Sequence, residues 1–418
     1  MNKTLVGGIV LIGVGILGLS WLFKKVSQSQ GQSQSQIPDY SYIISVSDND
    51  GIIESMNGIT GNIDFSGTDA GTVIQNSINA VISGGIIFIK SGVYKITKQE
   101  PIFTNNISVV GEGVDATILD FSASAEGQIL IDGRENIAFK SLTFKSDINI
   151  GIDRIKFNNT NGILFDNIKT IGGGKDWTNF MVHFNTGNSN IVITNVEATG
   201  SIDSPFRFYK TNTGLIVNNY YAHDLISCNC GDGMDIFGVR NATITNFRAI
   251  NIPGNGLGIY AAAKNININH IVCENVGYGT GNSHIGKGIS IVRWDDKDPS
   301  DIFINDFKVV NSNGHGLQIF TMASPSSNSV ASGTINNISI TNFQSTGSWW
   351  SGFTFEGGNV NNVIVSNFTV AQANVSNTGS PPIYFNAVCN NIKISDGVLV
   401  KPYIPFTIPV GVTFENVN

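Results

Sequence analysis

Short alternations of apolar and polar residues recur along most of the chain, each written apolar-x-apolar-x-Asn or Asp. The copies follow one another at intervals of about 24 to 36 residues. A two-residue alternation is typical of a β-strand with one buried face, so each copy is predicted to be a short strand. The polar position that closes each copy falls on Asn167, Asn195, Asn219, Asn246, His270, Asp306, Asn342, Asn367 and Asp396.

A second class of short alternating strand interleaves with the first in strict order. Its members are Val182–Phe184, Phe206–Phe208, Met234–Ile236, Leu257–Ile259, Ile289–Ile291, Leu317–Ile319, Phe353–Phe355 and Ile383–Phe385. A β-sandwich would instead need hairpin turns of about two to five residues. The fixed two-strand order predicts an all-β solenoid, a parallel β-helix whose turns stack about 4.8 Å apart. Asn suits its corners, because Asn tolerates the left-handed backbone region and can hydrogen-bond along a stack.

The segment ahead of the coil has the periodicity of a helix. Apolar residues of the stretch from Gly71 to Ser83 share one helical face, namely Val73, Ile74, Ile78, Val81 and Ile82. We expect this amphipathic helix to cap the open end of the solenoid. Residues 46–100 are therefore predicted to be an N-terminal cap, and residues 101–418 the β-helix body.

The N-terminus carries one long apolar stretch. Leu5 to Phe23 is a run of 19 apolar or small residues between Lys3 and Lys24, long enough to span a bilayer. A cleaved signal peptide is the alternative, but the run exceeds a usual h-region and no A-x-A-like site follows it. We expect residues 1–25 to be a transmembrane anchor and the Ser/Gln-rich residues 26–45 a flexible linker. The body would then lie outside the cytoplasm, at a cell surface or viral envelope.

Composition narrows the classes of partner. Among 418 residues, apolar types make up 41% and charged types 13%, and the net charge is -7. A chain with this net negative charge has no excess of positive charge to attract a phosphate backbone, so nucleic acid is excluded as a partner. The 4 cysteines make neither a C-x-x-C pair nor a zinc spacing, and we expect them to be small buried hydrophobes.

Three motifs in and after the predicted cap occur in a fixed order. The amphipathic helix is followed by Gly84-Gly85 before an apolar strand, then by Ser91-Gly92-Val93-Tyr94 and the turn Val110-Gly111-Glu112-Gly113. With the repeats behind them, roughly residues 65 to 415, they resemble the pectate-lyase-like superfamily. The resemblance implies a right-handed parallel β-helix with a polysaccharide or glycan partner, since that superfamily includes polysaccharide lyases, glycoside hydrolases, epimerases and virus tailspikes. A homotrimer is left open.

The longest insertions border the second strand class on both sides. We expect them to rise as walls, so that outward side chains of these strands form the floor of a groove. One outward row runs His183, Arg207, Asp235, Gly258, Ser290, Gln318, Thr354 and Tyr384. Its first three members are the leading catalytic candidates, because an Asp near a cation could bind a metal or act as a base, and Arg207 could neutralise a substrate carboxylate. Gly258 is expected to leave a notch beside them. The alternative is an ordinary surface ion-pair ladder.

A second outward row holds four aromatic residues on which sugar rings could stack: Tyr209, Phe237, Tyr260 and Phe320. The alternative is that wall loops fold over these rings and bury them. The other substrate-binding candidates are Glu356, His315, Lys287 and Arg293.

Three carboxylates fall near the start of the groove: Asp203, Asp232 and Asp235. Residues 231–236 partly resemble the Gly-Asp-Asp-Cys segment of polygalacturonases, and residues 313–317 their Gly-His-Gly segment. The adjacent Asp pair is missing, however, and His315 lies about 14 Å from Asp235 by turn spacing, too far for one acid/base set. The resemblance implies a histidine one turn after Asp235, where Asn255 or Gly256 stands. The carboxylates could serve inverting hydrolysis, with Asp232 joining the catalytic candidates, or all three could hold Ca²⁺.

The expected function is recognition, with or without cleavage, of a polysaccharide or cell-surface glycan by a membrane-anchored β-helix protein. A polysaccharide lyase or polygalacturonase-like hydrolase is the first alternative. A structural surface or virion spike protein without glycan activity is the second.

Overall fold

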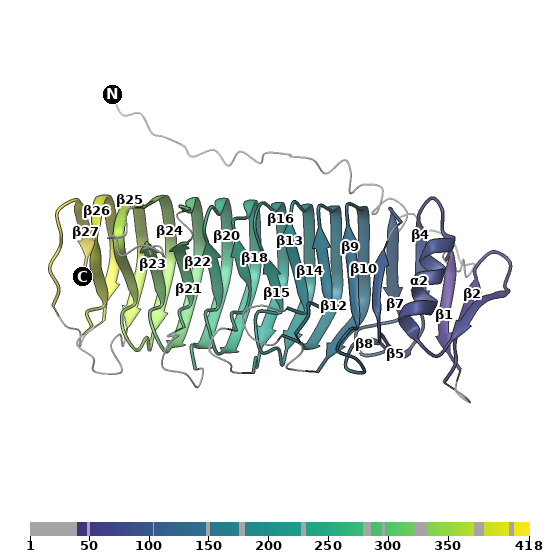
Figure 1. Cartoon of the computed structure of the whole chain (residues 1–418). Helices are drawn as coiled ribbons and strands as arrows, with labels where there is room; N and C mark the ends of the chain where they lie inside the picture. The colour runs from purple at the N-terminus through teal and green to yellow at the C-terminus, as the bar shows by residue number, and fades with distance from the viewer. Residues whose placement is uncertain are drawn as a thin grey trace, which may run out of the picture. The chain divides into compact units, whose positions relative to one another are not determined.

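The computed structural model describes residues 40–47, 51–102, 104–147, 151–174, 180–226, 231–278, 286–294, 297–321, 333–371, 380–400 and 405–418. Within them, one α-helix and 27 strands build a parallel β-helix whose turns, here called rungs, stack along one axis (Figure 1). The anchor predicted for residues 1–25 and the linker up to residue 39 lie outside the described residues. In the part of the chain that the structure describes, no helix is long and apolar enough to cross a bilayer.

Long strands, one in each rung, correspond to the first repeat class. They are β10 (Glu135–Ser146), β12 (Asn161–Gly172), β14 (Ser189–Thr199), β16 (Thr213–His223), β18 (Arg240–Ile252), β20 (Lys264–Val276), β22 (Ser300–Ser312), β24 (Thr334–Thr346), β25 (Phe353–Ala371), β26 (Ile383–Leu399) and β27 (Val412–Val417). Each pairs in parallel with the long strand of the next rung, as in the register Ile191↔Leu215. The predicted solenoid is confirmed.

Nine of the long strands, from β12 to β26, bend at the predicted polar residue. Asn195, in β14, has φ 54, in the left-handed region. Ile193 before it and Val196 after it are therefore both buried, at 0% and 2% exposure. All nine predicted bend residues share this conformation. These strands thus contribute to two parallel sheets.

Two further stacks of left-handed asparagines were not predicted. One lies near the start of the long strands, where Asn265 Nδ2 donates to Asn241 Oδ1 at 3.0 Å. The other lies near their ends, where Asn275 Nδ2 donates to Asn251 Oδ1 at 3.0 Å. A side-chain amide can donate to one rung and accept from the next, so such stacks satisfy polar groups along the solenoid.

A third parallel sheet is built from the second repeat class and is called the groove sheet. Its strands are β6 (Gln99–Ile102), β9 (Gln128–Asp132), β11 (Ile155–Asn158), β13 (Val182–Thr186), β15 (Phe206–Phe208), β17 (Asp235–Phe237), β19 (Leu257–Tyr260), β21 (Ile289–Arg293), β23 (Leu317–Thr321) and the first residues of β25 and β26. Its inward residues fill the core with stacked rings, such as Phe184 and Phe208 with centroids 4.5 Å apart.

The cap lies at the N-terminal end of the coil (Figure 1). Helix α2 (Ala70–Ala80) begins after Asp69, whose side chain accepts a hydrogen bond from Thr72 N. The helix is confirmed, but it ends before Ile82, which is 95% exposed rather than buried. The remaining strands are β1 (Tyr42–Val46), β2 (Ile53–Asn57), β3 (Ile63–Gly67), β4 (Gly85–Ile89), β5 (Gly92–Lys95), β7 (Ile107–Gly111) and β8 (Thr117–Asp120).

Strand β1 corrects the predicted linker. It pairs antiparallel with β2 and parallel with β4, and Ile44 within it is fully buried. A flexible linker therefore cannot extend to residue 45, since the chain is part of the cap from Tyr42 onwards.

Candidate functional site

The outward row predicted for the groove sheet has the predicted register. His183 pairs with Arg207, Arg207 with Asp235, and Asp235 with Gly258 on successive rungs. The row is not an open floor, however. His183 is 9% exposed and Asp235 is 7% exposed. The polar groups of this row therefore act on one another at low dielectric, where their interactions are stronger than at a surface.

Three carboxyl groups, here called the carboxyl cluster, lie close together: Asp203, Asp232 and Asp235. Asp203 and Asp232 are in the turns that lead into β15 and β17, and Asp235 is the first residue of β17. Asp203 accepts a hydrogen bond from Ser204 N at 2.6 Å. Burial, with the nearby Asp235 charge, raises the pKa of Asp203 to about 8.

Asp232 is the best hydrogen-bonded member of the carboxyl cluster. Asn255 N donates to Oδ1 at 2.6 Å, while Asn255 Nδ2 and the Tyr260 hydroxyl donate to Oδ2 at 3.1 and 2.7 Å. Burial raises the pKa of Asp232, and these donors oppose that shift. Asn255, which stands where the resemblance implies a histidine, thus holds the carboxylate in place.

Asp235 lies beside both a carboxyl group, that of Asp232, and a cation, that of Arg207. Burial, followed by the charge of Asp232, raises the pKa of Asp235 well above its ordinary value, and Arg207 opposes the shift. Arg207 Nη1 lies 4.0 Å from Asp235 Oδ2. The guanidinium also lies over the rings of Phe180 and Phe237, at 4.6 and 5.4 Å from their centroids. The environment therefore favours a protonated Asp235 beside a fixed positive charge.

Tyr260 corrects the predicted aromatic row. Its hydroxyl reaches back to Asp232, and a Cβ added at Gly258 would lie 2.2 Å from Tyr260 Cε2. The predicted notch at Gly258 is therefore filled by the Tyr260 ring. Phe237 packs beside it, with ring centroids 4.9 Å apart. Tyr260 is a hydrogen-bond donor of the carboxyl cluster, and its ring is not a free platform.

His183 has a partner that the sequence analysis missed. Its Nδ1 lies 2.8 Å from Asp153 Oδ2, and Lys156 Nζ lies 3.3 Å from the same oxygen. Phe180 N also donates to Asp153, at 3.0 Å. Asp153 was missed because the second repeat class was recognised only from Val182 onwards, one rung later. One signal could have indicated Asp153: it lies just before β11, as Asp232 lies just before β17.

Several polar atoms around this region are buried without a hydrogen-bond partner among the described residues. They are His183 Nε2, Asp203 Oδ2, Ser204 Oγ and Asp235 Oδ1. Buried polar atoms are nearly always hydrogen-bonded, because leaving one unpaired costs about 1–3 kcal/mol. Four such atoms on neighbouring rungs mark a polar region within the groove sheet, where the Ser204 side chain lies beside Asp203 and Asp235.

A second polar cluster, called the His315 cluster, lies further along the groove sheet. His315 Nε2 is 3.2 Å from Glu356 Oε1, and Gln318 Nε2 donates to Glu356 Oε2 at 2.9 Å. Burial lowers the pKa of His315, and Glu356 opposes that shift. Lys287 lies between the two clusters: burial lowers its pKa, while the charges of Glu356 and Asp232 oppose the shift.

The last two binding candidates have different surroundings. Arg293 is 5% exposed and donates from Nε to Asp298 Oδ1 at 2.7 Å, so this arginine is engaged within the fold. Phe320 pairs in register with Val292 and Glu356 on the neighbouring rungs.

The calcium hypothesis does not fit the residues present. Among the described residues, no group of three or more His, Cys, Asp or Glu side chains is arranged to hold a metal ion. Both oxygens of Asp232 already accept hydrogen bonds, and the Arg207 cation lies beside Asp235. Calcium takes six to eight oxygen ligands, and these three side chains do not supply such a set.

Comparison with known proteins identifies the fold. No protein-family model and no curated protein match the chain. The catalytic domain of a GH87 alpha-1,3-glucanase in complex with nigerose does match, with TM-score 0.54 and 15% identity over 86% of this chain and 69% of that one. Endo-xylogalacturonan hydrolase from Aspergillus tubingensis matches with TM-score 0.53 and 13% identity over 90% of this chain and 100% of that one.

A third structure is the A-module of a mannuronan C-5 epimerase from Azotobacter vinelandii, with TM-score 0.50 and 12% identity over 84% of this chain and 91% of that one. All three are parallel β-helix proteins. The chain has the fold of the pectate-lyase-like superfamily.

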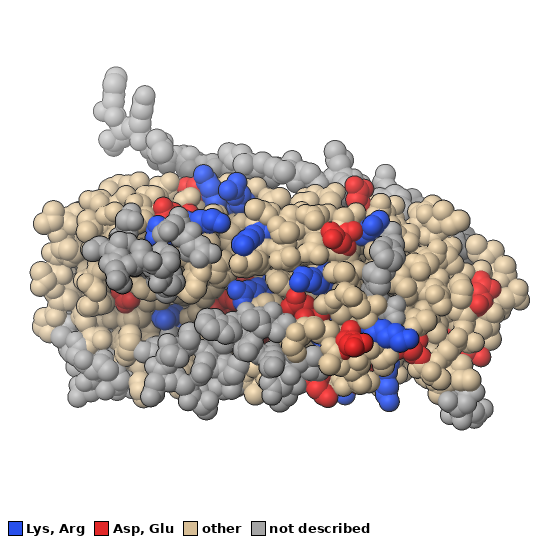
Figure 2. Space-filling view, viewed as in Figure 1, with Lys and Arg blue, Asp and Glu red and all other residues tan. Residues whose placement is uncertain are grey.

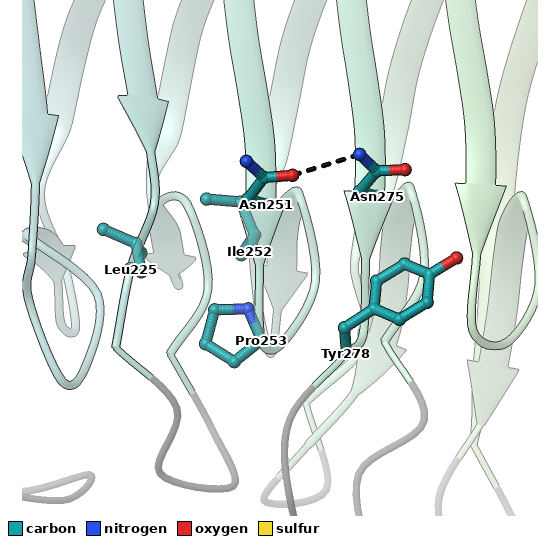
Figure 3. A pocket seen from close by; sticks show the side chains of 6 residues that line it. All are labelled: Leu225, Asn251, Ile252, Pro253, Asn275 and Tyr278. Carbon is teal, nitrogen blue, oxygen red and sulfur yellow. Dashed lines mark hydrogen bonds between the residues drawn. The ribbon is translucent and has the colours of Figure 1, made fainter.

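Two of the hollows in the described part of this β-helix differ in character. One, about 450 Å³, is lined by Leu225, Asn251, Ile252, Pro253, Asn275 and Tyr278. Figure 3 shows Leu225, Pro253 and Tyr278 on successive rungs beside the bonded Asn251–Asn275 pair. The described residues that line this hollow include no acid and no predicted site residue.

The smaller hollow, about 340 Å³, lies at the downstream ends of β15, β17 and β19 and includes Tyr209 and Phe237. It therefore adjoins the strand that carries Asp235. Charged side chains of both signs intermingle over the middle of the face seen in Figure 2.

Proposed function

We propose that this chain binds a polysaccharide along the groove sheet and hydrolyses a glycosidic bond at the carboxyl cluster. The observation that carries the proposal is Asp235, whose pKa is raised well above its ordinary value beside a second carboxyl group. Its side chain is still 9% exposed. A carboxyl group whose pKa is raised by burial and by a neighbouring carboxylate, and whose side chain is not wholly enclosed, meets the needs of a general acid.

In the proposed reaction, Asp235 gives its proton to the glycosidic oxygen as the bond between that oxygen and the sugar carbon breaks. A water oxygen forms the new bond to that carbon, and a second carboxylate takes the water proton. Asp232 is one candidate for this base, since its hydrogen-bond donors favour the charged form. Asp203 is the other, but its pKa is raised to about 8, so it would be charged only near or above that pH.

The similar folds support polysaccharide as the substrate class. The three proteins are an alpha-1,3-glucanase, an endo-xylogalacturonan hydrolase and a mannuronan C-5 epimerase. The location belongs to the same proposal: an anchor within residues 1–25 would hold the groove outside the cytoplasm. Fractionation of cells expressing the full chain and a chain without residues 5–23 tests this, and unchanged membrane recovery of the shortened chain would contradict it.

The test of hydrolysis uses the full-length chain and a panel of neutral and acidic polysaccharides, with new reducing ends and unsaturated products scored together. We expect new reducing ends without unsaturation, and a loss of about 10²- to 10⁴-fold in Asp235→Asn. Asp115→Asn is the matched control, since the Asp115 side chain is 88% exposed. The same loss in Asp232→Asn or Asp203→Asn identifies the base. Full activity of Asp235→Asn would overturn the proposal, and unsaturated products would indicate a lyase.

A second candidate function is glycan recognition without cleavage. Asp203 and Asp232 are only 1% and 4% exposed, which favours a structural role for these two carboxyl groups. In that case the native chain would bind a polysaccharide of the panel without releasing new ends, and Asp235→Asn would bind it equally well.

A further inference from the structure

Neither Asp232 nor Asp203 is well placed to be the base of the proposed hydrolysis. Both oxygens of Asp232 accept hydrogen bonds, at 2.6, 3.1 and 2.7 Å from Asn255 N, Asn255 Nδ2 and the Tyr260 hydroxyl. Asp203 keeps its proton below about pH 8, because burial raises its pKa to about 8. A general base must be unprotonated and must reach the water that it activates. The row that carries Asp235 holds another titratable group, His183.

Asp153 determines which nitrogen of His183 carries a proton. The Nδ1 atom of His183 lies 2.8 Å from Asp153 Oδ2, and Phe180 N donates to Asp153 Oδ1 at 3.0 Å. Burial disfavours a charged Asp153, but these hydrogen bonds and the Lys156 ammonium, 3.3 Å away, lower its pKa below the ordinary value. Because a carboxylate only accepts hydrogen bonds, the proton is on Nδ1 of His183. The Nε2 atom then carries a lone pair, as a base requires.

His183 and Asp235 lie on the same outward row, two rungs apart, with Arg207 between them in register. Two rung steps of about 4.8 Å place their backbones about 10 Å apart. In inverting glycosidases the acid and the base are about 6.5–9.5 Å apart, which leaves room for the attacking water. The row therefore suits an acid and a base on either side of one glycosidic bond.

His183 and Asp235 are also more accessible than the other two carboxyl groups of the cluster. His183 is 9% exposed and Asp235 7%, against 1% for Asp203 and 4% for Asp232. Of these four groups, the two that the row places at a suitable spacing are therefore the two that solvent reaches most readily.

The hollow at the downstream ends of β15, β17 and β19 borders both residues. Its lining includes Tyr209, whose ring centroid is 6.4 Å from that of His183. It also includes Phe237, which follows Asp235 by two residues on β17. A sugar unit in this hollow would therefore neighbour both His183 and the proposed acid.

We propose that His183 is the general base of the hydrolysis and that Asp153 is its positioning residue. Nε2 of His183 takes a proton from water as the water oxygen forms its bond to the sugar carbon. Asp235 gives its proton to the glycosidic oxygen as the old bond breaks. His183 then releases its proton to solvent, and Asp235 takes one up. The inference rests on the proposed function and gives to His183 the base role for which Asp232 and Asp203 are the carboxyl candidates.

The first test is the pH dependence of kcat/KM for the full-length chain, on the polymer of the panel that it cleaves. The acid limb of such a profile reports the base, and the alkaline limb reports the acid. The described titratable and charged groups that face His183 are Asp153 and Lys156, in and before β11, and Arg207 and Tyr209 on β15. We expect His183→Ala to abolish the acid limb and to keep the alkaline limb.

Rates separate the two roles. His183→Ala should lower kcat by about 10²- to 10⁴-fold with little change in KM, because a base acts only in the reaction step. Asp153→Asn should lower kcat by about tenfold or more, since an amide can also donate to Nδ1 and so favours the wrong tautomer. His270→Ala and Asp306→Asn are the matched controls. These two residues form an exposed pair at 2.7 Å, and both variants should keep the native rate.

Azide provides a further readout that a structural role would not move. It attacks the sugar carbon without losing a proton, so it needs no base. Added azide should restore turnover in His183→Ala and in Asp153→Asn but not in Asp235→Asn. Thermal unfolding of each variant shows that it is folded, and His183→Gln replaces the alanine variant if that one unfolds.

A measurement without turnover tests the role of Asp153 by itself. The nitrogen NMR shifts of the His183 ring in the full-length chain, recognised by their loss in His183→Gln, should show a proton on Nδ1 and a lone pair on Nε2. A proton on Nε2 instead would overturn the positioning role.

The outcomes separate this inference from the proposed function. An active native chain whose acid limb survives in His183→Ala, or disappears in Asp232→Asn, would overturn the inference and leave hydrolysis in place. A native chain that cleaves nothing, or full activity of Asp235→Asn, would contradict the proposed function and the inference with it.

Discussion

The hydroxyl of Tyr260 donates to Oδ2 of Asp232 at 2.7 Å, across the rungs that carry β17 and β19. The ring reaches back over Gly258 to make this contact. This relationship joins the aromatic row to the carboxyl cluster, and it helps the carboxylate of Asp232 to persist in a buried site.

Removal of the Tyr260 hydroxyl should weaken the charged form of Asp232. Tyr260→Phe leaves the ring in place, so we expect a stability loss of about 1 kcal/mol and a lower rate of polysaccharide cleavage. Thermal unfolding and initial rates measure the two effects. Tyr384→Phe, in the same sheet and 37% exposed, is the control. Equal rates in both variants would show that Asp232 does not need this donor.

A side chain at Gly258 should displace Tyr260. The added Cβ of Gly258→Ala would lie 2.2 Å from Tyr260 Cε2, so the ring must move and release Asp232. We expect a stability loss of about 1–3 kcal/mol, as for overpacking in a core. Gly113→Ala is the control, because the nearest atom to its added Cβ is 3.9 Å away.

The double variant gives a sharper test of the same contact. In a Tyr260→Ala background the clash is absent, so Gly258→Ala should cost much less than it does in the native chain. If the stability losses of Gly258→Ala and Tyr260→Ala simply add in the double variant, the proposed clash between the new Cβ and the Tyr260 ring is contradicted.

Asp203 should make stability depend on pH. Burial raises its folded-state pKa from the ordinary value of 3.8 to about 8. The folded chain then holds a proton that the unfolded chain loses, so this contribution is full below about pH 4 and is lost as pH rises toward about 8. We therefore expect Asp203→Asn to gain stability relative to the native chain as pH rises. Urea unfolding at several pH values, with Asp115→Asn as the control, measures the difference; a gap that does not change with pH would be the contrary result.

The stacking of Arg207 should stabilise the site more than a similar exposed contact does. Its guanidinium lies over the rings of Phe180 and Phe237, while that of Arg248 lies 5.1 Å from the Tyr221 ring centroid. Arg207→Lys should cost about 1–2 kcal/mol and Arg248→Lys less than 1 kcal/mol, because cation–π contacts are stronger when desolvated. Denaturant unfolding compares them. A larger loss in Arg248→Lys would argue against this account.

Strand order and register were predictable because they depend on local alternation and on repeat length. The row His183, Arg207, Asp235 and Gly258 follows from counting residues between apolar pairs, and the structure has this register. The bend at Asn195 was also predictable, since few residues other than Asn and Gly occupy the left-handed region at low cost.

The contacts between side chains were not predictable, because they depend on the length of each corner and on side-chain rotamers. Asp153 and His183 are 30 residues apart, and the spacing of the repeats does not say that their side chains meet. The hollow at the downstream ends of β15, β17 and β19 is lined by Lys210, Arg240 and Lys297 from separate rungs, and no local pattern relates them.

The sequence by itself determined the solenoid, the order of its strands and the outward row that carries Asp235, because a two-residue alternation and a repeated rung length are local properties of a chain. Only the tertiary structure decided that this row is buried, that Tyr260 fills the space above Gly258, and that three carboxyl groups share one region of low dielectric. Those properties depend on how neighbouring rungs pack together and exclude water, and the sequence of a single repeat does not contain this information.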